Sequence, residues 1–375
     1  MTKLSNNRNS VANIDWILIA SGWLATQIVL YAIYGINMRE EALTHISFAE
    51  NLVNGTVPFE LHRIWYSGYT VLLMLVRWLR LPYESVYILQ LGLSFISVIY
   101  FIKIVSLRAS TRTAIVLSGL MYATCFIAHQ WTNHLFTDAV FFYLLVIAIY
   151  YLLNEGESKR NKIIFWLLLL LLPFFRPVGF LFIVVACAHW IFTSPKANRI
   201  KILTASIYLA IMFIMAYQSI VINSGYFYPF NNLNAEIICG RSSDLLQYQV
   251  VPYTENTSII EYFRNNPELA LRLFCSRLYK SFSMTRSYFS SGHNLAIGAV
   301  CAVYYTLAAA GMVNMVAKKI KTRYFLPVGC LVFCVPSVIF CVEWHGRMSI
   351  PMMAFMLLIA AEGIDTLLKL YNARK

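Results

Sequence analysis

Two adjacent glutamates, Glu40 and Glu41, stand just beyond the first long apolar run of the chain, at the start of the stretch EEALTHISFAENLVNG (40–55). His45 follows Glu41 by four residues, so a helix would place these two side chains on one face. A carboxylate that is partly desolvated beside lipid can act as a general base. The alternative is that the glutamates only favour the N-terminus of a helix electrostatically.

A second ionisable pair, His134 and Asp138, stands where another apolar run begins, in WTNHLFTDAVFF (131–142). An ionisable residue at the edge of a membrane span is a candidate functional residue. The alternative is that Thr137 or Asp138 caps the N-terminus of that helix. The residues themselves do not decide between these two interpretations.

Two arginines interrupt apolar surroundings, Arg176 in FFRPVGF (174–180) and Arg347 in EWHGR (343–347). An arginine between apolar runs is costly unless it meets water, a carboxylate or a phosphate. The planar fork of its guanidinium group suits phosphate oxygens. We therefore expect at least one of the two to bind an anionic ligand. The alternative for Arg347 is an interfacial anchor paired locally with Glu343.

Motifs for nucleotides and metals are absent from the sequence, which contains no GxGxxG, no GxxxxGK[ST] and no HExxH. We expect no cofactor and no metal, although a divalent metal stays open as an alternative because six of the seven histidines fall on one predicted side. Cys239 and Cys275 lie in one predicted outer loop, where they could pair in an oxidising compartment.

The composition places these residues in a membrane. The chain has 375 residues, of which 59% are hydrophobic and 13% are charged, whereas soluble domains are about half apolar and about a quarter charged. This excludes a soluble enzyme, a disordered chain and a disulfide scaffold. Apolar runs of a length that suits membrane spans occur at 16–36, 84–105, 113–129, 136–153, 202–222, 295–316, 324–342 and 348–368.

Two further stretches are ambiguous, because 66–79 is short for a span and 163–192 is long for one and short for two. The positive-inside rule decides both. If 66–79 lies on the outer surface and 163–192 crosses as two short helices that meet near Arg176, ten helices cross and both termini are cytoplasmic. The cytoplasmic side then holds 18 of the 30 basic residues, and its excess accounts for the net charge of +13. The charge thus indicates topology and no nucleic-acid partner.

This topology leaves two large outer loops, 37–83 and 223–294, so we expect the chemistry at the outer face. In the first loop, residues 39–54 have the pattern of an amphipathic helix that would lie on the membrane surface. Its apolar face is expected to consist of Ala42, Ile46, Ala49 and Val53, with Glu41 and His45 on the other face.

The order of these motifs resembles the GT-C glycosyltransferases, multi-span enzymes that use a polyprenyl-phosphate sugar, and is most similar to the branch of bacterial aminoarabinose transferases and protein O-mannosyltransferases. The segments that carry the resemblance are EEALTHISFAENLVNG (40–55), WYSGYTVLL (65–73), Thr137-Asp138, RPVG (176–179) and EWHGR (343–347). The second segment lacks the prolines of the family pattern, and a glutamate replaces the usual aspartate at position 41. The resemblance covers most of 15–195 and about 340–365, but not 223–294.

The resemblance implies an all-α polytopic fold with a catalytic module at 1–222, a large outer loop at 223–294 and a three-helix segment at 295–375. It implies inverting transfer of a sugar from an undecaprenyl-type phosphate to a hydroxyl of a cell-envelope glycan or lipid, at the outer face of a bacterial inner membrane. Glu41 would be the base, with Glu40 as the second candidate, and Asp138 would orient the acceptor or share that role. The implied phosphate-binding residues are Arg63, Arg176, His345 and Arg347, and the implied substrate-binding residues are His45, Tyr66, Tyr69, His134 and Glu343.

Two other functions fit parts of the pattern. A polymerase acting on a lipid-diphosphate-linked saccharide would also use a large outer loop and outer arginines, but it has no particular need for an acidic pair after the first span. A flippase or transporter of such saccharides usually has internal repeats and ionisable residues near the bilayer midplane. The gathering of charges at one face disfavours the transporter.

Overall fold

The computed structural model describes residues 12–39, 41–56, 61–221, 264–286, 289–339 and 347–374, without the side chains of 61–63, 216–221 and 339. Within these residues the regular structure is helical throughout, and the one extended pairing is an isolated bridge between Asn37 and His134. The predicted all-helical class is therefore confirmed for the described part of the chain.

Five helices of this part are long and apolar enough to cross a membrane, which gives the chain the character of a multi-pass membrane protein. They are α1 (Asn13–Tyr34), α4 (Glu84–Ser106), α7 (Thr137–Asn154), α15 (Ser291–Ala317) and α17 (Ile350–Ala373) with the short helix η5 (Arg347–Ser349) before it. A sixth candidate is the bent pair of α5 (Arg112–Ala123) with the segment Phe126–Asn133, which turns by 41°. The ten crossings stay a prediction.

The predicted break at Arg176 is confirmed, because two short helices, α8 (Lys159–Phe175) and α9 (Leu181–Thr193), meet there through η3 (Pro177–Phe180). Arg176 is extended, as expected for a residue that precedes proline. Gly179 packs so closely on α8 that a Cβ atom would lie 2.5 Å from the carbonyl of Leu172. The glycine is what lets the chain fold back at this point.

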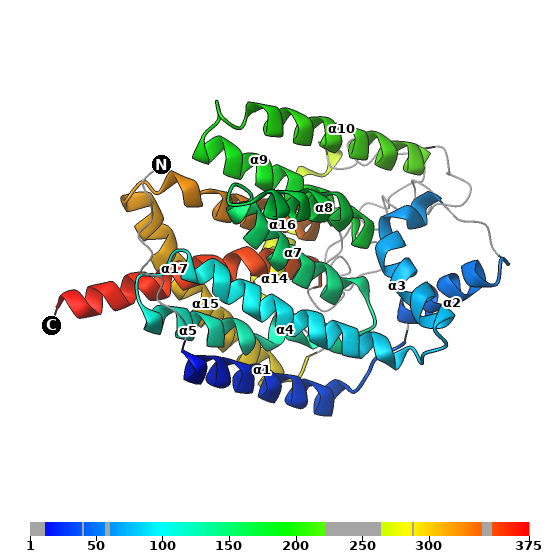
Figure 1. The fold of residues 1–375 in the computed structure, drawn as a ribbon, viewed down its shortest axis with the longest axis horizontal. Coiled ribbons are helices and arrows are strands. Elements are labelled where there is room, and N and C mark those ends of the chain that lie inside the picture. Colours follow the sequence, from blue (N-terminus) through cyan, green and yellow to red (C-terminus); the bar gives the residue numbers. More distant parts are fainter. Residues whose placement is uncertain are drawn as a thin grey trace.

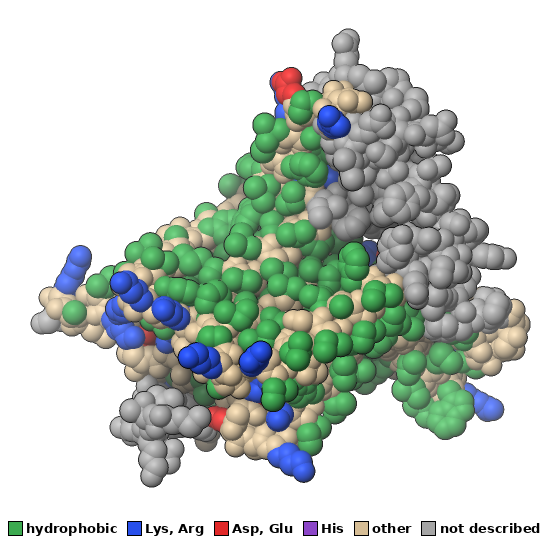
Figure 2. Space-filling model, turned by 90° about the horizontal axis from the view of Figure 1, so that it is seen from above, with side chains coloured by type: hydrophobic (Ala, Val, Ile, Leu, Met, Phe, Trp, Pro, Cys, Tyr) green, Lys and Arg blue, Asp and Glu red, His purple; other side chains and the backbone are tan. Residues whose placement is uncertain are grey.

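The centre of the bundle is α17, which is buried along most of its length and packs against α15, α16 (Phe325–Ile339), α5 and α7. Two further long helices of the described residues are α10 (Arg199–Val221), beside α9, and α14 (Pro267–Ser283), which packs on α16. In Figure 1, α1 begins and α17 ends at the same end of the molecule. Figure 2 shows a mostly hydrophobic flank, with Lys and Arg side chains gathered toward that end.

At the opposite end lie two short helices, α2 (Glu41–Val53) and α3 (Ser67–Trp78) (Figure 1). The 12 residues of α3 extend only about 18 Å, which is shorter than a membrane core of roughly 30 Å. In α2, Ala42, Ile46 and Ala49 share one face, as predicted, and this face is buried within the protein. Val53 is the last residue of α2, and its side chain is 40% exposed. Its contact with the membrane stays a prediction.

The crossing of α15 and α17 generates a prediction about stability. A Cβ atom on Gly363 would lie 1.8 Å from the carbonyl oxygen of Leu307, so Gly363→Ala forces the two helices apart. We expect a loss of about 1–3 kcal/mol in the free energy of unfolding, as is typical of overpacking. Gly298→Ala is the matched control, because that glycine lies on α15 in open space and helix propensity there favours alanine. Thermal unfolding in detergent measures both, and equal midpoints would contradict the close crossing.

Candidate functional site

The site begins with a backbone connection between the end of α1 and the segment before α7. The Asn37 N–H donates to the carbonyl of Asn133 (2.7 Å), and the Leu135 N–H donates to the carbonyl of Asn37 (3.1 Å). Side chains extend the connection, since Asn37 Nδ2 donates to His134 Nδ1 (3.0 Å) and Asn133 Nδ2 donates to the carbonyl of Gly35 (2.8 Å). The first turn of α2 is thereby held beside the first turn of α7.

Asp138, in the first turn of α7, is buried between two arginines. Its carboxylate accepts a hydrogen bond from Arg176 Nη1, and it pairs with Arg347 through Nε–Oδ1 (3.3 Å) and Nη2–Oδ2 (3.2 Å). The N-cap of α7 is Phe136, and no side chain caps it. The capping interpretation of Thr137 and Asp138 is therefore wrong, because the Asp138 carboxylate bonds to the arginines instead.

Arg347 also bonds to Glu41, at the start of α2. Its Nη1 donates to Glu41 Oε2 and its Nη2 to Oε1 (3.0 Å), while its guanidinium lies 5.5 Å from the ring centre of Phe136. Glu41, Asp138, Arg176 and Arg347 thus form one cluster from four separate segments, which we refer to as the charge quartet. Its two positive and two negative charges balance.

Glu41 is the most accessible carboxylate of the quartet, with 28% of its side chain exposed. Burial raises the pKa of Glu41, but hydrogen bonds from His45 and Arg347 and the charge of Arg347 lower it by more. The pKa of Glu41 therefore lies well below its ordinary value, and His45 Nε2 stands 3.4 Å from its Oε1. In this arrangement Glu41 is ionised and a weak base.

A wall of aromatic side chains stands beside Glu41. The buried ring of His45 lies 5.4 Å from Tyr66 and 5.7 Å from Tyr69, measured between ring centres. Burial raises the pKa of Tyr66, which also feels the charges of the quartet. The Tyr69 hydroxyl donates to Gln90 Oε1 (3.5 Å), and Gln90 Nε2 donates to the carbonyl of His134 (2.9 Å). His45, Tyr69 and Gln90 thus connect α2, α3 and α4 to the segment before α7.

The structure brings together six of the residues that the sequence singled out: Glu41, His45, Tyr66, Asp138, Arg176 and Arg347, with Tyr69 behind them. His134 does not join them, because its ring is held in the connection to Asn37 and not in α7. Glu40, Glu343 and His345 lie outside the described residues, as does the side chain of Arg63. The same is true of Cys239, so its pairing with Cys275 is not tested.

Sequence reasoning missed several residues that build the site. Gln90 and Asn37 bond to backbone groups, Phe136 lies beneath Arg347, and the Met348 sulfur lies 3.7 Å from Arg176 Nη2. A polar Gln90 inside an apolar run was the one available signal, since a buried amide in a membrane span needs partners.

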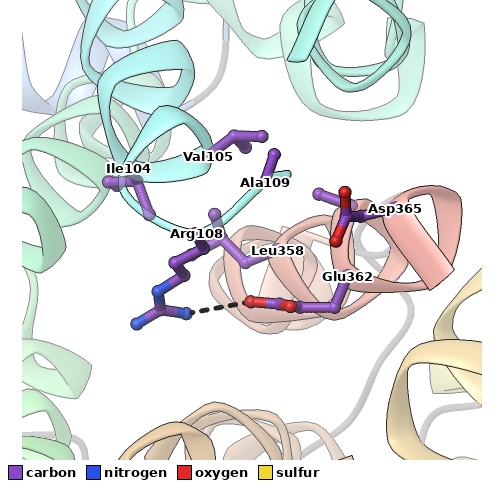
Figure 3. A pocket seen from close by; sticks show the side chains of 8 residues that line it. Ile104, Val105, Arg108, Ala109, Leu358, Glu362 and Asp365 are labelled. Carbon is purple, nitrogen blue, oxygen red and sulfur yellow. Dashed lines mark ion pairs between the residues drawn. The ribbon is translucent and has the colours of Figure 1, made fainter. Parts of the chain in front are cut away.

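A second cluster lies at the other end of the bundle (Figure 3). Arg108 and Arg323 pair with Glu362 of α17, and Asp365 accepts hydrogen bonds from the backbone and side chain of Ser110. The cavity beside them measures about 10 Å³, which is room for about one water molecule. This cluster fastens the α4–α5 turn to α17 and leaves no space for a substrate.

No family model matches the chain, and no curated protein or solved structure is significantly similar to it. Within the described ranges, no three His, Cys, Asp or Glu side chains are grouped as metal ligands would be.

The quartet generates a prediction about unfolding. Asp138→Asn removes the charge that pairs with both arginines, so we expect it to lower the free energy of unfolding by about 3 kcal/mol. Glu41→Gln should cost about 1 kcal/mol, because an amide oxygen still accepts from Arg347 and Asp138 still pairs with it. Unfolding of the two purified variants in detergent compares them, and a larger loss in Glu41→Gln would contradict the central place of Asp138.

Proposed function

We propose that this chain is a membrane glycosyltransferase. It moves one sugar from a polyprenyl-phosphate donor to a hydroxyl of a cell-envelope glycan or lipid, with inversion at the anomeric carbon. The observation that carries the proposal is the charge quartet, in which the partly exposed carboxylate of Glu41 lies against Arg347, and the buried carboxylate of Asp138 joins Arg347 to Arg176, at one end of a helical membrane bundle. Such a site offers a base and a phosphate-binding group within one side-chain length of each other.

The proposed orientation follows from the charge distribution. Ten spans with both termini in the cytoplasm would put the quartet, α2 and α3 at the outer face of the membrane, which we propose is a bacterial inner membrane. The donor is soluble in lipid, so it would enter sideways from the bilayer, with its phosphate at the level of the arginines. No nucleotide-binding motif is needed for such a donor.

The reaction has a simple balance of bonds and charges. The acceptor oxygen bonds to the anomeric carbon, the bond from that carbon to the phosphate oxygen breaks, and the acceptor proton passes to Glu41. The phosphodiester leaves as a phosphomonoester and gains one negative charge, while Glu41 loses one. Positioning and electrostatic stabilisation of the leaving phosphate would supply most of the acceleration.

Arg347 connects these two changes in charge. It is bonded to Glu41 and holds the pKa of that carboxyl low, so Glu41 is a weak base while the arginine stays there. A donor phosphate that takes up the guanidinium would raise the basicity of Glu41. As the proton arrives, Glu41 ceases to attract the arginine and the phosphate attracts it more strongly. Proton transfer and departure of the phosphate would therefore favour each other.

Asp138 and Arg176 would form the fixed part of the site. Asp138 is fully buried and bonds to both arginines, so it holds their planar forks in place. Arg176 lies at the break between α8 and α9, where the surrounding backbone fixes its position. Its charge could therefore face the phosphate without a conformational change. Tyr66 and His45 would line the sugar side of the site.

Native mass spectrometry of the purified protein separates this proposal from its alternatives. We expect a co-purified polyprenyl monophosphate, bare or carrying one sugar, and the added mass would give the class of that sugar. A polyprenyl diphosphate oligosaccharide would instead favour the polymerase or the flippase. The sugar-carrying form of this lipid then serves as the donor in the activity assays.

Glu41→Gln is expected to reduce turnover at least 100-fold, because loss of a general base typically removes a factor of about 10²–10⁴. The measurement is release of polyprenyl phosphate from the donor by the purified variant. Glu84→Gln is the matched control, since Glu84 is an exposed glutamate in the first turn of α4. Near-normal turnover in folded Glu41→Gln would overturn the assignment of the base.

Arg347→Ala is expected to weaken use of the donor about tenfold to 100-fold, the value of one or two charge-assisted hydrogen bonds, and to change the apparent KM of the acceptor much less. Initial rates with each substrate varied in turn give the two values. Arg112→Ala removes another arginine paired with a carboxylate, Asp15, at the other end of α1 and serves as the control. Equal effects on both substrates would argue against a phosphate-binding role.

A further inference from the structure

A groove separate from the charge quartet runs between the end of α2 and the turn that joins α3 to α4. Its volume is about 720 Å³, and its walls include Val53 on one side and Arg77, Trp78, Arg80 and Leu81 on the other. A volume of this size falls in the range of ligand-binding clefts. We refer to it as the α2–α3 groove.

An apolar face of α3 leads into this groove. Val71, Leu75 and Trp78 follow one another at helical spacing and are 52%, 50% and 75% exposed. A row of exposed apolar side chains on a short helix is typical of helices that lie in the membrane interface, and tryptophan favours the level of the headgroups. The groove thus opens where lipid headgroups and acyl chains meet.

Two exposed arginines stand at the end of this face. No carboxylate of the described residues pairs with Arg77 or Arg80. Glu50, on the last turns of α2, accepts a hydrogen bond from the Tyr83 hydroxyl (3.2 Å). The described residues that line the groove include both arginines and no carboxylate. The charge at the groove is therefore complementary to an anion, and basic residues at a membrane surface attract anionic headgroups.

The backbone at Arg80 indicates that its charge has a use apart from folding. Arg80 has a left-handed φ of 55°. Its N–H donates to the carbonyl of Arg77 (3.0 Å), and the Leu81 N–H donates to that of Val76 (3.0 Å). This pair of bonds is the Schellman arrangement, whose left-handed position is usually glycine. Local folding favours glycine at 80, yet the chain carries an arginine there.

We propose that the α2–α3 groove binds the phosphate headgroup of an anionic membrane phospholipid. Arg77 and Arg80 contact the phosphate, and the acyl chains lie along Val71, Leu75 and Trp78. The bound lipid fixes the depth and tilt of α3 in its leaflet. This inference does not depend on glycosyl transfer, because the groove shares no residue with the quartet.

The test uses the full chain in detergent and phosphatidylglycerol with brominated acyl chains, which quenches nearby tryptophans. The contribution of Trp78 is the difference between the natural chain and Trp78→Phe. Arg80→Gly removes the charge and supplies the residue that the turn favours, so folding is preserved. Lys319→Gly is the matched control, because Lys319 has a φ of 50° and occupies the same Schellman position after α15, at the other end of the molecule.

We expect Arg80→Gly to raise the phosphatidylglycerol concentration for half-maximal quenching of Trp78 about fivefold, the effect of one basic residue at a membrane surface. Addition of Arg77→Gln should raise it further, and Lys319→Gly should leave it unchanged. The thermal midpoint of Arg80→Gly should equal or exceed that of the natural chain. Three outcomes would each overturn the proposal. The first is equal quenching by brominated phosphatidylcholine, and the second is an unchanged half-maximal phosphatidylglycerol concentration in Arg80→Gly. The third is displacement of phosphatidylglycerol by polyprenyl phosphate and by no other anionic lipid.

Discussion

The buried carboxylate of Asp138 is the interaction on which the rest of the structure depends. An ionised group in apolar surroundings is stable only when it is paired, and the same holds for each arginine beside it. Asp138 satisfies Arg176 and Arg347 together, and these residues come from the break between α8 and α9 and from the start of α17. The start of α7, the break after α8 and the start of α17 must therefore meet at one point. Glu41 joins them because Arg347 Nη2 also donates to its carboxylate.

The sequence could identify the members of this cluster but not its pairings. Glu41, Asp138, Arg176 and Arg347 stand out because a charge at the edge of an apolar run needs a reason. The break at Arg176 was predictable from the Arg-Pro step and the length of the run. By contrast, the sequence alone does not predict that Arg347 pairs with Glu41, or that Asn37 bonds to the segment before α7. Those pairings depend on contacts between segments that are far apart in the chain.

The two charged clusters lie at opposite ends of one helix. The segment from Arg347 to Asp365 begins in the quartet and ends at the cluster that includes Glu362, Arg108 and Arg323. Between them α17 is buried on nearly every face and crosses α15 at a glycine contact that leaves no room for a side chain. Because α17 is packed on nearly every face between the two clusters, the position of Arg347 is set by packing over the whole length of the bundle.

The equal numbers of positive and negative charges in the quartet have an electrical consequence. A charge that moves through a membrane potential gains or loses about 2.3 kcal/mol per 100 mV, but a compact group of zero net charge feels almost no net force from the field. In the proposed reaction the proton that reaches Glu41 and the charge that appears on the phosphate also cancel within the same site. Turnover would therefore run at the same rate in energised and de-energised cells, with the transmembrane voltage neither driving nor opposing it.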